Sequence, residues 1–145
     1  RLARWYLARG AKHLVLLDEC GITPEIAAAI EEMRREGIEI VIEKCQFDDA
    51  ESIKAVFDRI NGSVFPLKGV VHAVDVSCNA LIRFMSEEVF FRLHRIQVSL
   101  SWLLHLYSQK WDLDHFVLFS SSLSHLDPYG KANLAAGGSF LEALS

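Results

Sequence analysis

The chain has 145 residues, of which 51% are hydrophobic, and its formal net charge is −4. A chain of this length buries about two-thirds of the surface that it exposes when unfolded, so we expect one hydrophobic core and a single domain over residues 1–145. The slight negative charge and the scattered lysines and arginines form no basic stripe, which excludes nucleic acid as an expected partner.

The cysteines and the apolar segments indicate a cellular compartment. Cys20, Cys45 and Cys78 lie far apart and lack the spacing of a zinc site, so we expect reduced thiols and no bound metal. The apolar runs are too short to span a bilayer, and none has the layout of a signal peptide. We therefore expect a cytoplasmic protein without a membrane segment.

Helical and extended segments alternate along the chain. The hydrophobic pattern predicts, in chain order, a helix over residues 2–9, a strand over 13–17, a helix over 23–37, a strand over 38–42, a helix over 48–60, a strand over 68–72, a helix over 86–109, a strand over 115–119 and a helix over 133–144. The strands are predicted to be buried. The long helix would bury Val89, Leu93, Ile96, Leu100, Leu103 and Leu104. The last helix would bury Leu134, Phe140, Leu141 and Leu144.

Cap residues mark several helix ends. Thr23 followed by Pro24 predicts a helix N-terminus, as do Ser86 and one of the two residues Asp48 and Asp49. Strands that alternate with helices of this length pair in parallel through right-handed crossovers, which predicts a doubly wound α/β sheet of Rossmann-like type. Ligands of such folds bind at the carboxyl ends of the strands.

Separated sequence blocks resemble one family in the order and spacing in which that family has them. These blocks are ARWYLARGAKHLVLL at 3–17, GVVHAVDV at 69–76, FVLFSS at 116–121 and ANLAAGGSFLEAL at 132–144. They resemble the ketoreductase domains of polyketide synthases and fatty acid synthases, which are oxidoreductases of the short-chain dehydrogenase/reductase superfamily. The resemblance covers nearly the whole chain. It implies a Rossmann-like fold truncated at both ends, because residues 1 and 145 both fall within helical patterns.

The resemblance also implies where catalytic residues should stand. The family protonates the alkoxide left by hydride transfer with a Tyr beside a Lys, assisted by a Ser and an Asn. The Ser is retained as Ser121, thirteen residues before the Tyr position. The Tyr, Lys and Asn positions carry Leu134, Gln97 and Gly138. Leu134 has no proton to donate, and the loss of a positioned acid costs ~10²- to 10⁴-fold in rate.

Two alternatives remain for the chemistry near the last strand. Tyr129 and Asn133 are themselves spaced as a Tyr and an Asn four residues apart, a YxxxN string, so Tyr129 could supply the proton. Tyr129, however, follows Ser121 by only eight residues. His125 near the serines raises a hydrolase as a further alternative, but the sequence has no GxSxG motif and no obvious acid to orient the histidine.

The cofactor positions implied by the resemblance are altered as well. The family binds NADP(H), and a Ser-Arg pair at the end of the second strand holds the 2′-phosphate. Asp18 and Glu19 replace that pair, so they would repel the phosphate or instead bind the ribose hydroxyls of NAD(H). Asp75 replaces a Gly that lets the cofactor approach the backbone. The remaining expected cofactor positions are Gln46, Phe47, His72, Ala73 and Val74.

Taken together, these substitutions predict a ketoreductase-like domain of a polyketide or fatty acid synthase-type multienzyme that is a pseudo-enzyme. Its reductase activity would be lost or severely impaired, and its role would be structural or in docking. The resemblance implies neighbouring synthase domains and an acyl carrier protein as partners. The alternatives are an active NAD(P)H-dependent reductase of β-ketoacyl thioesters and a module that binds a small molecule without turnover.

Overall fold

The computed structural model describes residues 1–74, 80–122, 125–126 and 129–145, and their contacts divide the chain into two compact units, Arg1–Gln46 and Phe47–Ser145. Two parallel strands form a small sheet in each unit. The parallel pairing agrees with the α/β prediction. The prediction of a single domain over 1–145 stays a prediction. No helix of the described part combines the length and the apolar character that a membrane crossing needs.

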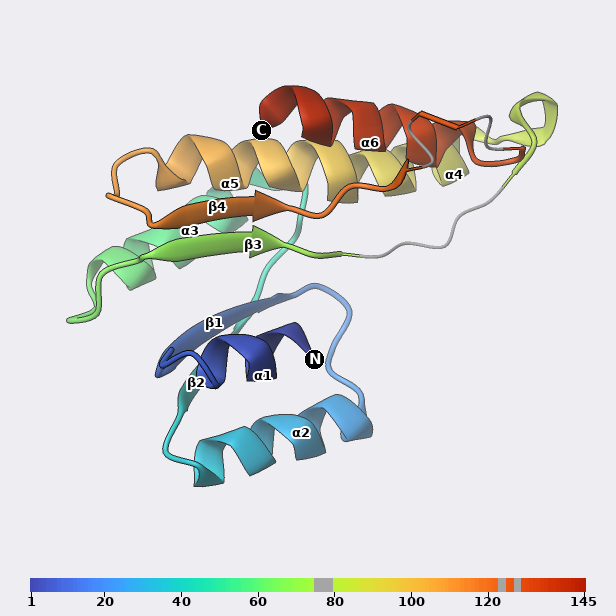
Figure 1. Ribbon diagram of the computed structural model, residues 1–145. Helices are drawn as coiled ribbons and strands as arrows, with labels where there is room; N and C mark the ends of the chain where they lie inside the picture. Colours follow the sequence, from blue (N-terminus) through green and yellow to red (C-terminus); the bar gives the residue numbers. More distant parts are fainter. Residues whose placement is uncertain (75–79, 123–124, 127–128) are drawn as a thin grey trace. The chain divides into compact units, whose positions relative to one another are not determined.

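The first unit packs two helices against one strand pair. It contains α1 (Leu2–Leu7), β1 (His13–Asp18), α2 (Pro24–Arg35) and β2 (Glu39–Lys44). Figure 1 shows α1 and α2 beside the strand pair. The core of the unit consists of Ile30, Met33 and Ile40, with partly buried side chains from α1 and β1 around them.

The strands of this unit are less buried than the sequence predicts. Val15 of β1 is 40% exposed and Val41 of β2 is 39% exposed. Both point away from the face on which Leu14, Leu16 and Ile40 join the core, because side chains alternate along a strand. The prediction that residues 13–17 are buried throughout is therefore wrong for one face of the strand.

The second unit contains the segments that the resemblance associates with catalysis. Its elements are α3 (Ala50–Asn61), β3 (Gly69–His72), η1 (Ile82–Phe84), α4 (Glu87–His94), η2 (Arg95–Ser99), α5 (Leu100–Ser108), β4 (His115–Leu118) and α6 (Ala132–Leu144). In Figure 1, α4 and α5 follow one another as one long helix, and α6 lies alongside it. The buried apolar residues of this unit include Ile53, Val56, Phe57, Val70, Leu93, Leu100, Leu104 and Leu141.

The helix caps confirm the predictions and settle one alternative. Thr23 accepts a hydrogen bond from the backbone N–H of Ile26, and Pro24 opens α2. Asp49, not Asp48, caps α3, since its carboxylate accepts the N–H groups of Glu51 and Ser52 at 3.1 and 3.2 Å. These bonds satisfy donors that have no partner within the first turn of a helix.

The predicted helix over 86–109 is interrupted by a turn of π-helix, η2. A π-turn inserts one residue into the helical repeat and shifts the faces that follow it. Gln97, four residues after Leu93 and three before Leu100, shares their face of the helix and is only 6% exposed, whereas Ile96 is half-buried. Of the residues predicted to pack inward from this helix, Val89 and Ile96 are therefore only half-buried.

The last helix is buried through small residues. Asn133, Gly137, Gly138 and Leu141 are buried on α6, while Leu134, Phe140 and Leu144 are half-buried. Glycines let α6 come close to α4 and η2, so small side chains occupy the contact and larger ones flank it. Of the predicted buried face, only Leu141 is fully buried.

Candidate functional site

The residues at the predicted catalytic positions come from three elements of the second unit. Ser121 follows β4 and is half-buried, Gln97 lies in η2, and Leu134 and Gly138 lie on α6. Ser120 donates from its hydroxyl to the carbonyl oxygen of Gly138 at 3.3 Å, which brings the segment after β4 next to α6. The structure therefore brings the end of β4 beside the helix that carries the Tyr and Asn positions.

Gln97 fills the space between η2 and α6. Its side chain is 6% exposed, and Oε1 has no hydrogen-bond partner among the described residues. A Cβ atom on Gly137 would overlap Oε1 and would lie 2.9 Å from Cδ of Gln97. The group at the Lys position is thus a neutral amide turned against the backbone of α6. The family chemistry needs a cation at this position, because the cation lowers the pKa of the catalytic Tyr.

His72 connects the end of β3 to the π-turn. Its Nε2 lies 2.8 Å from the carbonyl oxygen of Ile96, and because a carbonyl only accepts, Nε2 carries the hydrogen. Nδ1 is then an acceptor, and it has no partner among the described residues. Burial lowers the pKa of His72 below its ordinary value of 6.5, so the ring is neutral near pH 7. A neutral ring held by a backbone carbonyl braces the helix and is not placed to act as a base.

The segment after β4 contains a contact between His125 and Glu142 that the sequence did not reveal. Nε2 of His125 lies 2.9 Å from Oε2 of Glu142, and the Ser120 hydroxyl, whose one hydrogen serves both this carboxylate and the Gly138 carbonyl, lies 3.1 Å from Oε1. The sequence offered no obvious acid for His125, because Glu142 is seventeen residues away on α6 and only the fold brings it near. The carboxylate stands between the serine and the histidine, whereas a hydrolase needs the histidine bonded to the serine. This order disfavours the hydrolase alternative.

Tyr129 lies in solvent. Tyr129 is 84% exposed. Asn133, the other member of the YxxxN string, is 2% exposed, and its Oδ1 accepts the N–H of Leu134 at 2.9 Å. A catalytic acid is most effective in a site from which water is excluded. The environment of Tyr129 is therefore unlike that of a proton donor in a closed crevice.

The predicted cofactor residues of the first unit lie where β1 and β2 end. Asp18 and Glu19 are half-buried, and Gln46 is exposed. The carboxylate of Asp18 accepts the N–H of Gly21 at 2.9 Å, and its carbonyl accepts the N–H of Cys45 at 2.9 Å.

The electrostatics at this end of the first sheet are acidic. The pKa of the Cys45 thiol is raised, chiefly by burial, and further by the negative charges of Glu19, Glu43 and Asp18. Lys44, which pairs opposite Asp18 in the strand register, supplies one nearby cation. A 2′-phosphate needs cations and N–H donors, so carboxylates at the end of β1 in place of the family's Ser-Arg pair do not suit the phosphate of NADP(H).

The predicted cofactor residues of the second unit are mixed in exposure. Phe47 and His72 are buried, Val74 is half-buried, and Ala73 is exposed. Asp75 lies outside the described residues. No group of three or more potential metal ligands occurs within the described ranges.

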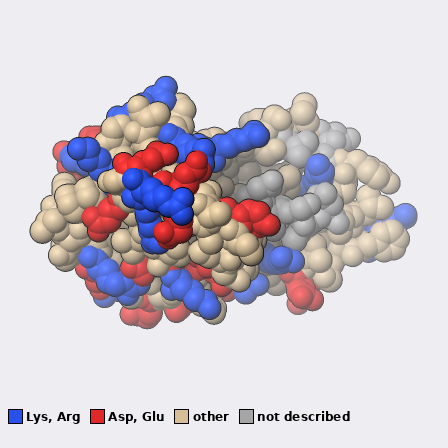
Figure 2. Space-filling model, turned by 90° about the horizontal axis from the view of Figure 1, so that it is seen from below, with Lys and Arg blue, Asp and Glu red and all other residues tan. Residues whose placement is uncertain are grey.

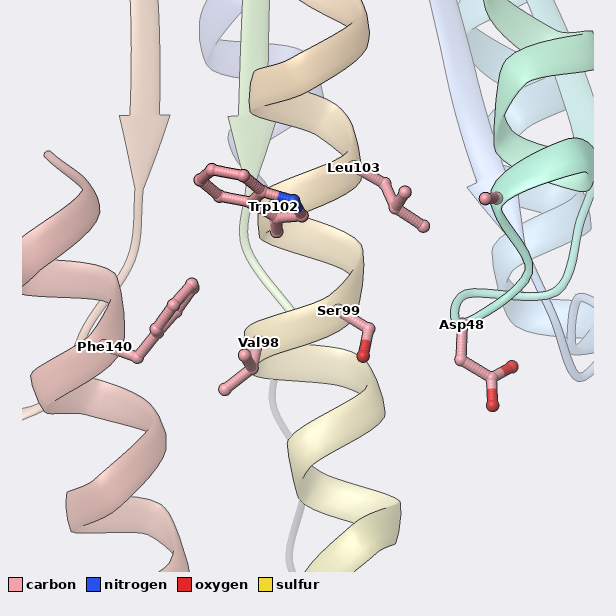
Figure 3. A pocket seen from close by; sticks show the side chains of 7 residues that line it. Asp48, Val98, Ser99, Trp102, Leu103 and Phe140 are labelled. Carbon is pink, nitrogen blue, oxygen red and sulfur yellow. The ribbon is translucent and has the colours of Figure 1, made fainter.

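An open groove of about 500 Å³ runs along the long helix (Figure 3). Val98 and Trp102 point from the helix toward Phe140 of α6, while Ser99 and Leu103 point toward the side on which Asp48 lies. Asp48 forms an ion pair with Arg95 at 3.6 Å. None of Gln97, Ser121, Leu134 and Gly138 lines the groove.

Charged side chains of both signs are interspersed on the molecular surface. On the face shown in Figure 2, the Lys and Arg side chains lie among the Asp and Glu side chains, and neither sign forms a continuous stripe. Such a distribution provides no extended field for steering a highly charged polymer.

Comparisons with known proteins identify the family. The model of the KR domain family matches residues 1–145. Among curated proteins, the phenolphthiocerol synthesis polyketide synthase type I Pks15/1 of Mycobacterium marinum is 34% identical over 99% of this chain and 7% of its own length. The partially reducing polyketide synthase men1 of Menisporopsis theobromae is 29% identical over 94% of this chain and 5% of its own length. The chain thus spans a small part of these relatives.

Solved structures agree with this match. An A1-type ketoreductase superposes with a TM-score of 0.90 at 30% identity, over 99% of this chain and 30% of that chain. The first ketoreductase of the tylosin PKS gives a TM-score of 0.86 at 32% identity, over 99% and 31%. A ketoreductase domain from the bacillaene assembly line gives 0.93 at 24% identity, over 99% and 34%, which shows the fold alone. The chain therefore belongs to the ketoreductase (KR) domain family of polyketide synthases, within the short-chain dehydrogenase/reductase superfamily.

Proposed function

We propose that this chain is a ketoreductase-like domain of a polyketide synthase-type multienzyme in which reductase activity is lost or severely reduced. The observation that carries the proposal is the environment of position 97. Gln97 is a buried amide packed against Gly137, in the place where the family motif has a lysine. Without that cation, and with Leu134 at the Tyr position, the two positions that supply and activate the proton in the family carry neither an acid nor a cation.

The retained serine does not replace the missing acid. Ser121 can donate a hydrogen bond to a ketone oxygen and orient it. Its hydroxyl is a poor source of a proton without a neighbouring relay, and Gly138 offers no side chain for one. Loss of the positioned acid alone predicts a rate ~10²- to 10⁴-fold below that of a complete site.

Weak nucleotide binding would reduce activity further. Ketoreductase domains of this superfamily typically use NADPH, and the acidic end of β1 opposes its 2′-phosphate. Should a nucleotide bind, NAD(H) suits these residues better, because a carboxylate can accept hydrogen bonds from the ribose hydroxyls.

The remaining role is structural. The second unit has a hydrophobic core, and Asp49 and Ser86 cap α3 and α4, although the polar catalytic positions are changed. The relatives named above are far longer than this chain, which supports neighbouring synthase domains as partners. Docking of an acyl carrier protein belongs to the same proposal.

Two measurements on the purified full-length protein test the proposal: a titration with NADPH and NADH, and an assay of ketone reduction. We expect neither NADPH nor NADH to bind at micromolar concentration by nucleotide fluorescence, and no turnover of a β-ketoacyl thioester. The matched control is the triple variant Gln97→Lys, Leu134→Tyr, Gly138→Asn assayed in parallel. Micromolar binding with turnover by the unaltered protein would establish the alternative, an active reductase of β-ketoacyl thioesters. Ligand-dependent thermal stabilisation without turnover would indicate a small-molecule binding module.

A further inference from the structure

Gln97 and Gly137 share one small space between η2 and α6. Gly137 is buried, and a Cβ atom at this position would overlap Oε1 of Gln97 and come within 2.9 Å of its Cδ and 3.0 Å of Cδ2 of Leu93. No L-residue with a side chain therefore fits at position 137 while the Gln97 amide stays where it is.

The backbone beneath Gln97 is held from the other side. His72 donates from Nε2 to the carbonyl of Ile96 at 2.8 Å, which ties η2 to the end of β3. Leu93, one turn before Gln97, is 1% exposed. A Cβ at position 137 could therefore be accommodated only if the Gln97 side chain left its recess.

The recess also supplies a weak partner for the amide oxygen. In glycine a Cα–H bond takes the direction in which other residues carry Cβ, so this bond of Gly137 points at Oε1 of Gln97. Cα–H groups that face carbonyl oxygens are weak donors at close helix contacts. Oε1 has no N–H or O–H donor among the described residues.

We propose that Gly137 is a positioning residue for the side chain at position 97. Its missing side chain opens a recess in α6 that receives the Gln97 amide and holds it against the helix backbone. The proposal concerns packing alone, so it holds whether or not the domain reduces a substrate.

A double-mutant cycle tests the coupling. Gly137→Ala in the native background should lower the melting temperature by about 3–8 °C, because the Gln97 amide is expelled from a buried position. In a Gln97→Ala background the same change should be neutral or should raise the melting temperature by about 2–4 °C, since alanine favours a helix over glycine. This change of sign is specific to contact between a Cβ at position 137 and the Gln97 side chain.

Exposed Ser139 on α6 provides the control. The difference between Ser139→Ala and Ser139→Gly measures the helix preference itself and should be the same in both backgrounds. If Gly137→Ala fails to fold, recovery of a cooperative melting transition by adding Gln97→Ala supports the proposal, and failure to recover it overturns the proposal. Stabilisation by Gly137→Ala in the native background, or equal losses in both backgrounds, would also overturn it, the latter by assigning the clash to Leu93.

Discussion

Acidification should destabilise the second unit through His72. The ring is 1% exposed, Nε2 donates to the Ile96 carbonyl, and Nδ1 faces no partner among the described residues. Protonation would place an unpaired charge in the core, which is why burial lowers the pKa of His72 below 6.5. The unfolded chain takes up the proton near its ordinary pKa while the folded chain resists it. Stability is therefore full above about pH 6.5 and falls as the pH decreases below that value.

The magnitude follows from one proton. Between the unfolded and the folded pKa, the free energy of unfolding decreases by at most about 1.4 kcal/mol for each pH unit. From pH 6.5 to 5 the loss from His72 is thus at most about 2 kcal/mol, which is a measurable fraction of the stability of a domain.

Urea unfolding at pH 7.5, 6.5, 5.5 and 5.0, followed by tryptophan fluorescence, measures this loss. The matched variant is His72→Gln, whose amide can still donate to Ile96 but does not titrate. We expect the native protein to lose stability relative to His72→Gln only below about pH 6.5. Parallel pH profiles for the two proteins, or a difference that grows above pH 7, would refute the assignment of a buried neutral imidazole.

Two further predictions concern the cap of α3 and the acidic end of β1. Asp49→Ala should lower the free energy of unfolding by about 1 kcal/mol, because two N–H groups lose their acceptor. Asp48→Ala removes no cap and should change the free energy of unfolding less. Urea unfolding measures both variants, and equal effects would contradict the assignment of Asp49 as the cap. Glu19→Arg should shift any nucleotide preference toward NADPH by about tenfold, because a repulsive charge becomes an attractive one. Comparative fluorescence titration with NADPH and NADH measures the ratio of the two dissociation constants. An unchanged ratio would mean that Glu19 does not face the 2′-phosphate.

Features that depend on neighbouring residues were predictable from the sequence. The caps by Thr23 and Asp49 involve N–H groups two or three residues further along the chain. Gly37, with φ of 85°, follows the last residues of α2 in the left-handed conformation that glycine adopts most easily. Alternation of such elements predicted parallel strands, and the sequence blocks predicted the family.

The candidate site was predictable as a set of positions but not as an arrangement. The sequence indicates that Leu134 and Gln97 stand at catalytic positions. It gives no signal that the Gln97 amide lies in a glycine recess, or that Glu142 pairs with His125. Both contacts join segments far apart in the chain, so no local pattern encodes them.

The sequence by itself determined the elements, their caps and the family, because short-range hydrogen bonds and hydrophobic periodicity act within a few residues. Only the tertiary structure decided which side chains are buried at the centre of the second unit. Within the π-turn at Arg95–Ser99, Gln97 is buried, and the carbonyl of Ile96 is held by His72, 24 residues earlier. Close packing of α6 then selects glycine over larger apolar residues, since the space left by the neighbouring helix sets the size that fits.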